Sequence, residues 1–120
     1  VKTGSYSTRL GYNAALDLLE LNDKPTAIFA ANDNMAIGSL KAAGKMGLRV
    51  PDDLSVAGYD DIQYAFYTSP SLTTVRQDQK ATGLTIAKTM LKSLTTKDYK
   101  PEIIKLSQEL IIRESTGKAK

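Results

Sequence analysis

The sequence predicts an α/β fold in which a parallel sheet is flanked by helices. Short apolar segments without polar alternation, at residues 26–31 and 54–59, are typical of strands buried on both faces of a parallel sheet. They alternate with longer segments whose apolar residues recur at helical spacing. This alternation is typical of βαβ units, whose right-handed crossovers place helices on both faces of the sheet.

In the first half of the chain, a helix is expected to start near Tyr6 or Ser7 and to end before Pro25. After the strand at 26–31, Asn32 or Asp33 is expected to cap a second helix. The apolar positions of that helix run from Met35 to Met46 and precede Gly47. The strand at 54–59 follows.

The second half begins with residues 62–70, which are expected to be irregular or a short helix. A third strand is expected at 72–75. Gln77 or Asp78 is expected to cap a helix that runs to about Leu94. Two late strands are expected, at Ile103–Leu106 and at Leu110–Ile112.

Composition excludes several classes of function. The chain has 120 residues and a net charge of +3 that is spread along it, which does not indicate a nucleic-acid surface. It has no Cys and no His, which excludes disulfides, thiolate zinc sites and Ser–His–Asp triads. No cofactor is expected. No apolar stretch is long enough for a membrane span and no signal peptide opens the chain. Because it opens with Val1, we expect a piece of a longer protein.

Polar residues follow three of the expected strands, at the edge where open α/β sheets bind ligands. They are Asn32-Asp33, Asp60-Asp61 and Arg76-Gln77-Asp78. Such carboxylates and amides suit the hydroxyl groups of a neutral polyol, and paired carboxylates also suit Mg²⁺. The same residues could instead cap helices and shape turns.

Aromatic residues offer two further alternatives. Tyr6, at the start of a helix, could stack on a ligand or form a hydrophobic staple with the first turn. Tyr64, Phe66 and Tyr67 lie in the irregular stretch, where they either fold inward or contact another chain.

Four segments resemble signatures of the LacI/GalR family of bacterial transcription regulators, in the family's order and spacing. Pro25–Ala36 resembles "PTAIFAANDxMA" and Gly47–Asp61 resembles "GLRVPxDxSVxGxDD". Ser71–Gln77, after Pro70, resembles "PLTTVRQ", and Ile112–Thr116 resembles the closing "xRxST".

The resemblance implies a periplasmic-binding-protein-like type I fold, in which two α/β lobes close on a small sugar-like or nucleoside-like effector. It assigns residues 1–74 and about 107–120 to the C-terminal lobe, and about 75–106 to the N-terminal lobe. The rest of the N-terminal lobe and the helix-turn-helix that binds operator DNA would lie outside this chain.

The resemblance also implies roles for single residues. Tyr6 matches an aromatic that stacks on the effector, Asn32 and Asp60 match residues that hydrogen-bond it, and Gln77 matches a glutamine at the lobe crossing. Asp33 and Asp61 are expected to be structural. The residues expected at a homodimer interface are Met35, Ser39, Tyr64, Phe66 and Tyr67.

Together these features predict the effector-sensing part of a cytoplasmic LacI-type repressor that is not an enzyme and contacts no membrane. Two alternatives stay open: a sugar-binding protein of a transport system, and an enzyme in which Asp60 and Asp61 hold Mg²⁺. An excised piece of this kind would expose a sheet edge, so we expect a dimer or a swapped oligomer.

Overall fold

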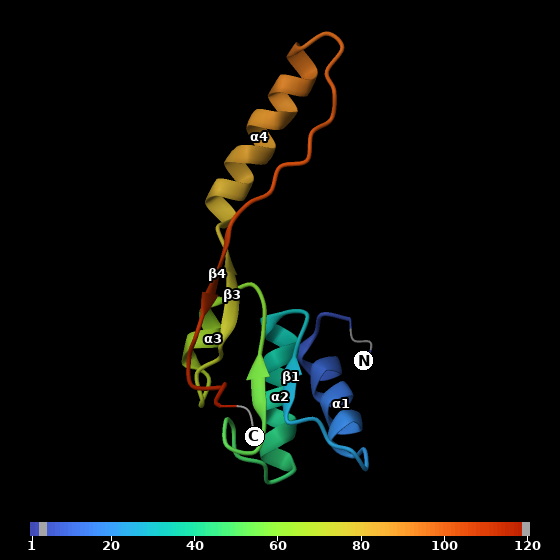
Figure 1. Ribbon diagram of the computed structural model, residues 1–120, viewed down its shortest axis with the longest axis vertical. Coiled ribbons are helices and arrows are strands. Elements are labelled where there is room, and N and C mark those ends of the chain that lie inside the picture. Colours follow the sequence, from blue (N-terminus) through green and yellow to red (C-terminus); the bar gives the residue numbers. More distant parts are fainter. Residues whose placement is uncertain (3–4, 119–120) are drawn as a thin grey trace. The chain divides into compact units, whose positions relative to one another are not determined.

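Three helices begin at residues whose side chains cap them, in a computed structural model that describes residues 1–2 and 5–118 (Figure 1). The cap oxygens of Ser7, Asn32 and Asp78 each accept a backbone N–H from the first helical turn. The two capping alternatives are thereby resolved, in favour of Asn32 over Asp33 and of Asp78 over Gln77. The elements are α1 (Thr8–Leu19), β1 (Ala27–Phe29), α2 (Asp33–Lys45), β2 (Ser55–Ala57), α3 (Gln63–Tyr67), β3 (Thr74–Gln77), α4 (Gln79–Thr95) and β4 (Gln108–Ile111).

The chain divides into two compact units. The first comprises Val1–Arg76 together with Leu110–Lys120, and the second comprises Gln77–Glu109. These limits lie close to residues 75 and 106, where the sequence predicted a separate segment. That the second unit belongs to another lobe stays a prediction.

The strands β1, β2 and β3 follow one another in parallel, as the sequence predicted. β1 pairs with β2 in the register Ala27↔Ser55 to Phe29↔Ala57. Two isolated parallel bridges, Ala57↔Thr73 and Asp60↔Arg76, join β2 to β3. β3 is hydrogen-bonded in turn to β4.

Ser115 is inserted between Val56 of β2 and Thr73, the residue before β3. The Val56 N–H donates to the Ser115 carbonyl at 2.8 Å, and the Ser115 hydroxyl donates to the Val56 carbonyl at 2.6 Å. The Thr73 N–H donates to the same hydroxyl at 2.8 Å. Ser115 is fully buried, and it satisfies strand groups that would otherwise lack a partner.

Helices α1 and α2 pack at close range because each presents a glycine to the other. A Cβ on Gly11 would stand 2.5 Å from the Met35 Cα, and one on Gly38 would stand 2.6 Å from the Tyr12 backbone N. The core below this contact is formed by Leu19, Leu54, Val56 and Leu72, which are fully buried.

Strand β1 departs from the expected burial on both faces. Ala27 and Phe29 are exposed, and Phe29 exposes 67% of its surface. In the described part of the chain, β1 has β2 as its one neighbouring strand. Ala27 and Phe29 lie two residues apart, so their side chains share one face of the sheet, and that face is exposed. The prediction of a strand buried on both faces was therefore wrong here.

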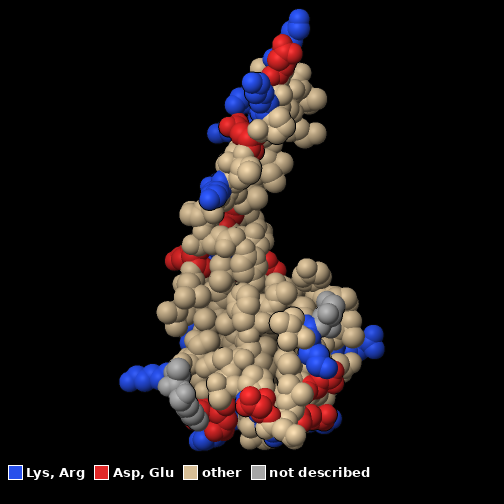
Figure 2. All heavy atoms as spheres, turned by 45° about the vertical axis from the view of Figure 1, so that its right-hand side comes forward, with Lys and Arg blue, Asp and Glu red and all other residues tan. Residues whose placement is uncertain are grey.

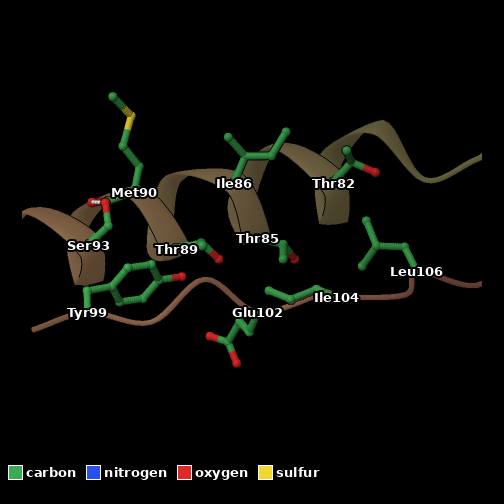
Figure 3. A pocket seen from close by; sticks show the side chains of 10 residues that line it. All are labelled: Thr82, Thr85, Ile86, Thr89, Met90, Ser93, Tyr99, Glu102, Ile104 and Leu106. Carbon is green, nitrogen blue, oxygen red and sulfur yellow. Dashed lines mark hydrogen bonds between the residues drawn. The ribbon is translucent and has the colours of Figure 1, made fainter.

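The second unit consists of α4 and a segment that returns alongside it (Figure 1). Ile103–Leu106 was expected to be a strand, but it is extended chain without strand pairing. Apolar β-branched residues form a strand only when a neighbouring strand accepts their backbone hydrogen bonds. Here the segment lies against a helix, and together they line an open hollow of about 460 Å³ (Figure 3).

Charge is mixed over the molecular surface. Figure 2 shows Lys and Arg side chains interspersed with Asp and Glu side chains on the face that it presents. Among the described residues, no helix combines the length and apolar character that crossing a membrane requires.

Candidate functional site

The carboxyl ends of β1, β2 and β3 lie side by side, as the polar pattern predicted. The Asp33 N–H donates to the Tyr59 carbonyl at 2.9 Å, which joins the segment after β1 to the segment after β2. The Asp60 N–H donates to the Val75 carbonyl at 2.9 Å, which joins that segment to β3. Asn32 and Asp60 therefore occupy neighbouring positions at one edge of the sheet.

Tyr6 stands directly before α1 and is tied to this edge. Its carbonyl accepts a hydrogen bond from the Asn32 side-chain amide at 3.2 Å. Its φ is 53°, and 68% of its surface is exposed. The staple alternative fails, because the helical position that would pack against Tyr6 is Gly11, which has no side chain. An exposed aromatic ring on a residue whose backbone is bonded to Asn32 is available for stacking on a ligand.

Asn32 caps α2, so the structural interpretation of this residue is confirmed. Its side-chain oxygen accepts the Met35 N–H at 2.9 Å while its amide group donates to Tyr6. The residue is 9% exposed. These bonds fix the orientation of the amide, and an amide oxygen retains a second lone pair for another donor.

Asp60 and Asp61 form a turn of unusual backbone geometry. Asp60 has a φ of 115° and Asp61 a φ of 53°, although neither is glycine. Such conformations store strain and concentrate at binding sites, where the surrounding structure holds them. Asp60 is half-buried.

Asp61 is held by two guanidinium groups. Its carboxylate accepts from Arg113 at 2.6 Å and from Arg76 at 2.7 Å. Burial opposes ionisation of this carboxyl, but the two arginines outweigh it and lower the pKa of Asp61 below its ordinary value. The predicted structural role of Asp61 is confirmed by these contacts.

The Asp61 contacts also bear on the magnesium alternative. Both oxygens of this carboxylate are engaged by arginine. Within residues 1–2 and 5–118, no group of three or more acidic, Cys or His side chains gathers in a way that could hold a metal ion. With both oxygens bound to guanidinium groups, the Asp61 carboxylate is poorly suited to a cation.

Asp33 is fully buried and links three segments of the first unit. One oxygen accepts from the Thr74 hydroxyl at 2.6 Å and the other accepts the Ile62 N–H at 2.9 Å. Burial raises the pKa of Asp33, and these hydrogen bonds offset only part of that effect. The expected structural role of Asp33 is confirmed.

Gln77 ends β3 and is the first residue of the second unit. Its role in binding stays a prediction. The hollow beside α4 contains none of the four predicted binding residues, and its one carboxylate, on Glu102, pairs with Lys92 at 3.0 Å.

Three residues of this edge were not singled out from the sequence, namely Thr74, Arg113 and Ser115. The Thr74 hydroxyl donates to Asp33 and accepts from the Asp61 N–H at 3.3 Å. Arg113 and Ser115 belong to the closing "xRxST" segment, to which the sequence assigned no role. The sequence signal that could have identified them is an arginine and a serine directly after the apolar residues Leu110–Ile112.

The residues expected at a subunit interface differ in exposure. Tyr64, Phe66 and Tyr67 on α3 are each more than 60% exposed, and the rings of Phe66 and Tyr67 meet edge to face at 5.3 Å. Met35 is 9% exposed and Ser39 is 3% exposed. The Met35 backbone lies against Gly11 of α1, and the Ser39 hydroxyl donates to the Met35 carbonyl. Buried side chains present little area to a partner, so among the predicted interface residues the three aromatic ones are available for contact. Their contact with a second subunit stays a prediction.

Comparison with known proteins gives a consistent set of matches. The family of periplasmic binding protein-like domains matches residues 1–116. An HTH-type transcriptional repressor PurR of Mannheimia succiniciproducens is 40% identical over 115 residues, which are 96% of this chain and 34% of the relative. The chain thus spans about a third of the length of the curated relatives that it matches.

Two solved structures have a similar backbone fold over nearly the whole of this chain. The lac repressor dimer bound to operator and the anti-inducer ONPF aligns with a TM-score of 0.86 at 34% identity, over 94% of this chain and 39% of that one. A LacI family transcriptional regulator of Enterococcus faecium with bound ribose aligns with a TM-score of 0.79 at 32% identity, over 93% of this chain and 41% of that one.

Proposed function

Because the chain belongs to the family of periplasmic binding protein-like domains, we propose that it is the effector-sensing part of a LacI-type transcriptional repressor. The observation that carries the proposal is the meeting of Tyr6, Asn32 and Asp60 at one sheet edge, with Asp60 in a strained conformation. The likeness to PurR and to the lac repressor supports the same function.

The effector is a small sugar-like or nucleoside-like molecule. The exposed Tyr6 ring stacks on its apolar face, because C–H groups of a sugar and the face of a base both pack on aromatic rings. Asp60 accepts hydrogen bonds from hydroxyl or N–H groups of the effector. The amide of Asn32 donates to the effector or accepts from it, and Gln77 contributes a further amide. The ribose in the Enterococcus faecium relative supports this class of ligand.

The protein acts as a cytoplasmic homodimer and is not an enzyme. Its mechanism is a shift in the populations of two arrangements of its lobes. An effector that binds one arrangement of the lobes more tightly biases the dimer, and with it a helix-turn-helix elsewhere in the longer protein that contacts operator DNA. A coupling free energy of about 1–3 kcal/mol is sufficient for such control. The exposed aromatic residues of α3 supply the contact between subunits.

The proposed site is tested by Asp60→Ala in the longer protein. Binding is measured by isothermal titration with a panel of D-ribose, D-glucose, lactose, adenosine and guanosine. We expect at least tenfold weaker binding of whichever compound binds the unaltered protein, since a hydrogen bond to a charged carboxylate contributes about 1.5–3 kcal/mol. The control is Asp23→Ala, an exposed carboxylate between α1 and β1. Equal affinity of the Asp60 and Asp23 variants would refute the site.

The transport alternative shares the fold, so the segment that precedes Val1 in the coding sequence decides between the two functions. A helix-turn-helix there supports the repressor. A secretory or lipoprotein signal there would replace the proposal by a sugar-binding protein of a transport system.

A further inference from the structure

We propose that Asp61, clamped by Arg113 and Arg76, is a positioning residue that holds the Asp60 carboxylate at the effector site. The proposal rests on the proposed function for what Asp60 binds. The clamp itself stands on contacts within the first unit.

Asp60 needs an external constraint because its backbone conformation is unfavourable for any residue with a side chain. A φ of 115° lies outside the left-handed region that aspartate tolerates and inside the region that glycine dominates. Such a conformation persists only where neighbouring contacts impose it. The hydrogen bond from the Asp60 N–H to Val75 fixes one side of this peptide.

Asp61 fixes the other side. Its N–H donates to the Thr74 hydroxyl, and its two carboxylate oxygens are bound by different arginines. Because both the backbone N–H and the carboxylate of Asp61 are bound, the peptide that joins it to Asp60 is held in place.

Arg113 is the rigid half of the clamp. One of its terminal nitrogens donates to the Leu72 carbonyl at 2.8 Å while the other donates to Asp61. Its backbone N–H donates to the Thr73 hydroxyl at 2.9 Å. The Arg113 side chain is 14% exposed, whereas that of Arg76 is 49% exposed. A buried, multiply bonded guanidinium transmits its fixed position to the carboxylate that it holds.

The consequence is that the clamp sets where the Asp60 carboxylate points. Without it, the turn can relax to negative φ, and rotation of the Asp60 backbone changes the direction of its side chain. Asp61 and Arg113 lie 52 residues apart in the sequence, so the clamp forms only in the folded chain. The closing segment of the chain thereby determines the geometry of a binding residue that it does not contain.

The test measures the Asp60 backbone directly, by the three-bond coupling between its amide and Cα protons. The isotope-labelled chain carries Phe29→Lys and Phe66→Lys throughout, because these exposed apolar side chains would otherwise promote association. This coupling depends on φ and is small near 115°. In Asp61→Asn and Arg113→Gln we expect it to rise toward the values of negative φ while the remaining amide signals stay dispersed. The matched control is Arg49→Gln, which breaks a similar two-pronged pair with Asp53 at 2.9 and 3.0 Å on the surface. An unchanged Asp60 coupling in folded Asp61→Asn would overturn the proposal.

If Arg113→Gln unfolds the chain, the half-exposed Arg76 supplies the second variant. Arg76→Gln removes one prong and leaves the buried one, so we expect a smaller change of the Asp60 coupling in the same direction. No change there, together with none in Asp61→Asn, would refute positioning. Because this readout needs no ligand, it is independent of the compound panel: a panel without binders refutes the proposed function and leaves the clamp result in place.

Discussion

Asp33 and Asp61 are two carboxyl groups whose pKa values are displaced in opposite directions. Burial raises the pKa of Asp33, and Arg113 and Arg76 lower that of Asp61 against the effect of burial. A carboxyl with a lowered pKa stabilises the folded state above its ordinary pKa of 3.8, and this stability is lost as pH falls through the lower folded value. A carboxyl with a raised pKa has the opposite sign, and its ionisation costs stability as pH rises above 3.8.

We therefore expect Asp61→Asn to flatten the loss of stability in strong acid, because the variant has no carboxylate to protonate at that position. Asp33→Asn should leave that acid limb in place and change the curve at higher pH instead. The measurement is the free energy of unfolding in urea from neutral pH down to about pH 3. Identical acid limbs for the unaltered chain and Asp61→Asn would contradict the assignment.

At this scale the sequence located the site residues but not the contacts that hold them. Asn32 and Asp60 follow apolar strands, so their place at the sheet edge could be predicted from local pattern. The partners of Asp61 could not, because Arg113 is 52 residues away and only the folded chain brings the two together. The strained φ of Asp60 is likewise invisible in a pattern of residue types, since aspartate is not the residue that such a φ favours.

Between elements, the contact of α1 with α2 depends on two glycines. A Cβ at Gly38 would meet backbone atoms of Thr8 and Tyr12, which cannot move aside without separating the helices. Nothing lies within 4 Å of a Cβ at Gly44, in the same helix.

We expect Gly38→Ala to lower the free energy of unfolding by about 1–3 kcal/mol, the usual cost of an overpacked contact. Gly44→Ala should raise it by about 0.5–1 kcal/mol, because alanine loses less backbone entropy in a helix. Urea denaturation of both variants measures the difference. Equal effects of the two substitutions would show that close packing at Gly38 is not what stabilises the helix pair.

Helices were the elements that the sequence predicted best, since their caps are local signals. Ser7, Asn32 and Asp78 lie one residue before a helix and bind its first turn. Strands depend on distant partners, and the two strand predictions that failed reflect this. β1 was expected to be buried on both faces, and Ile103–Leu106 was expected to be a strand.

For the whole molecule, the predicted α/β class and the periplasmic-binding-protein-like fold are confirmed by the helices, the parallel strands and the family match. Two surfaces of this molecule are apolar and exposed. One is the β1 edge with Phe29, where the parallel register turns the backbone groups of Ala27 and Phe29 away from β2. The other is the aromatic face of α3 with Phe66.

We expect the isolated chain to associate beyond dimers, because two separate surfaces on each copy allow growth. Phe29→Lys should limit assembly to dimers joined through α3, and Phe66→Lys to dimers joined through β1. The double variant should be monomeric. Static light scattering over a range of concentrations measures these masses, and a monomeric unaltered chain would contradict the prediction.

The insertion of Ser115 between β2 and β3 also has a consequence for how the protein is made. A ribosome synthesises Val56 and Thr73 long before Ser115, yet both strands depend on Ser115 for their backbone hydrogen bonds. The whole second unit, Gln77–Glu109, is synthesised in between. The sheet therefore stays incomplete while the nascent chain grows, and it closes only after Ser115 emerges.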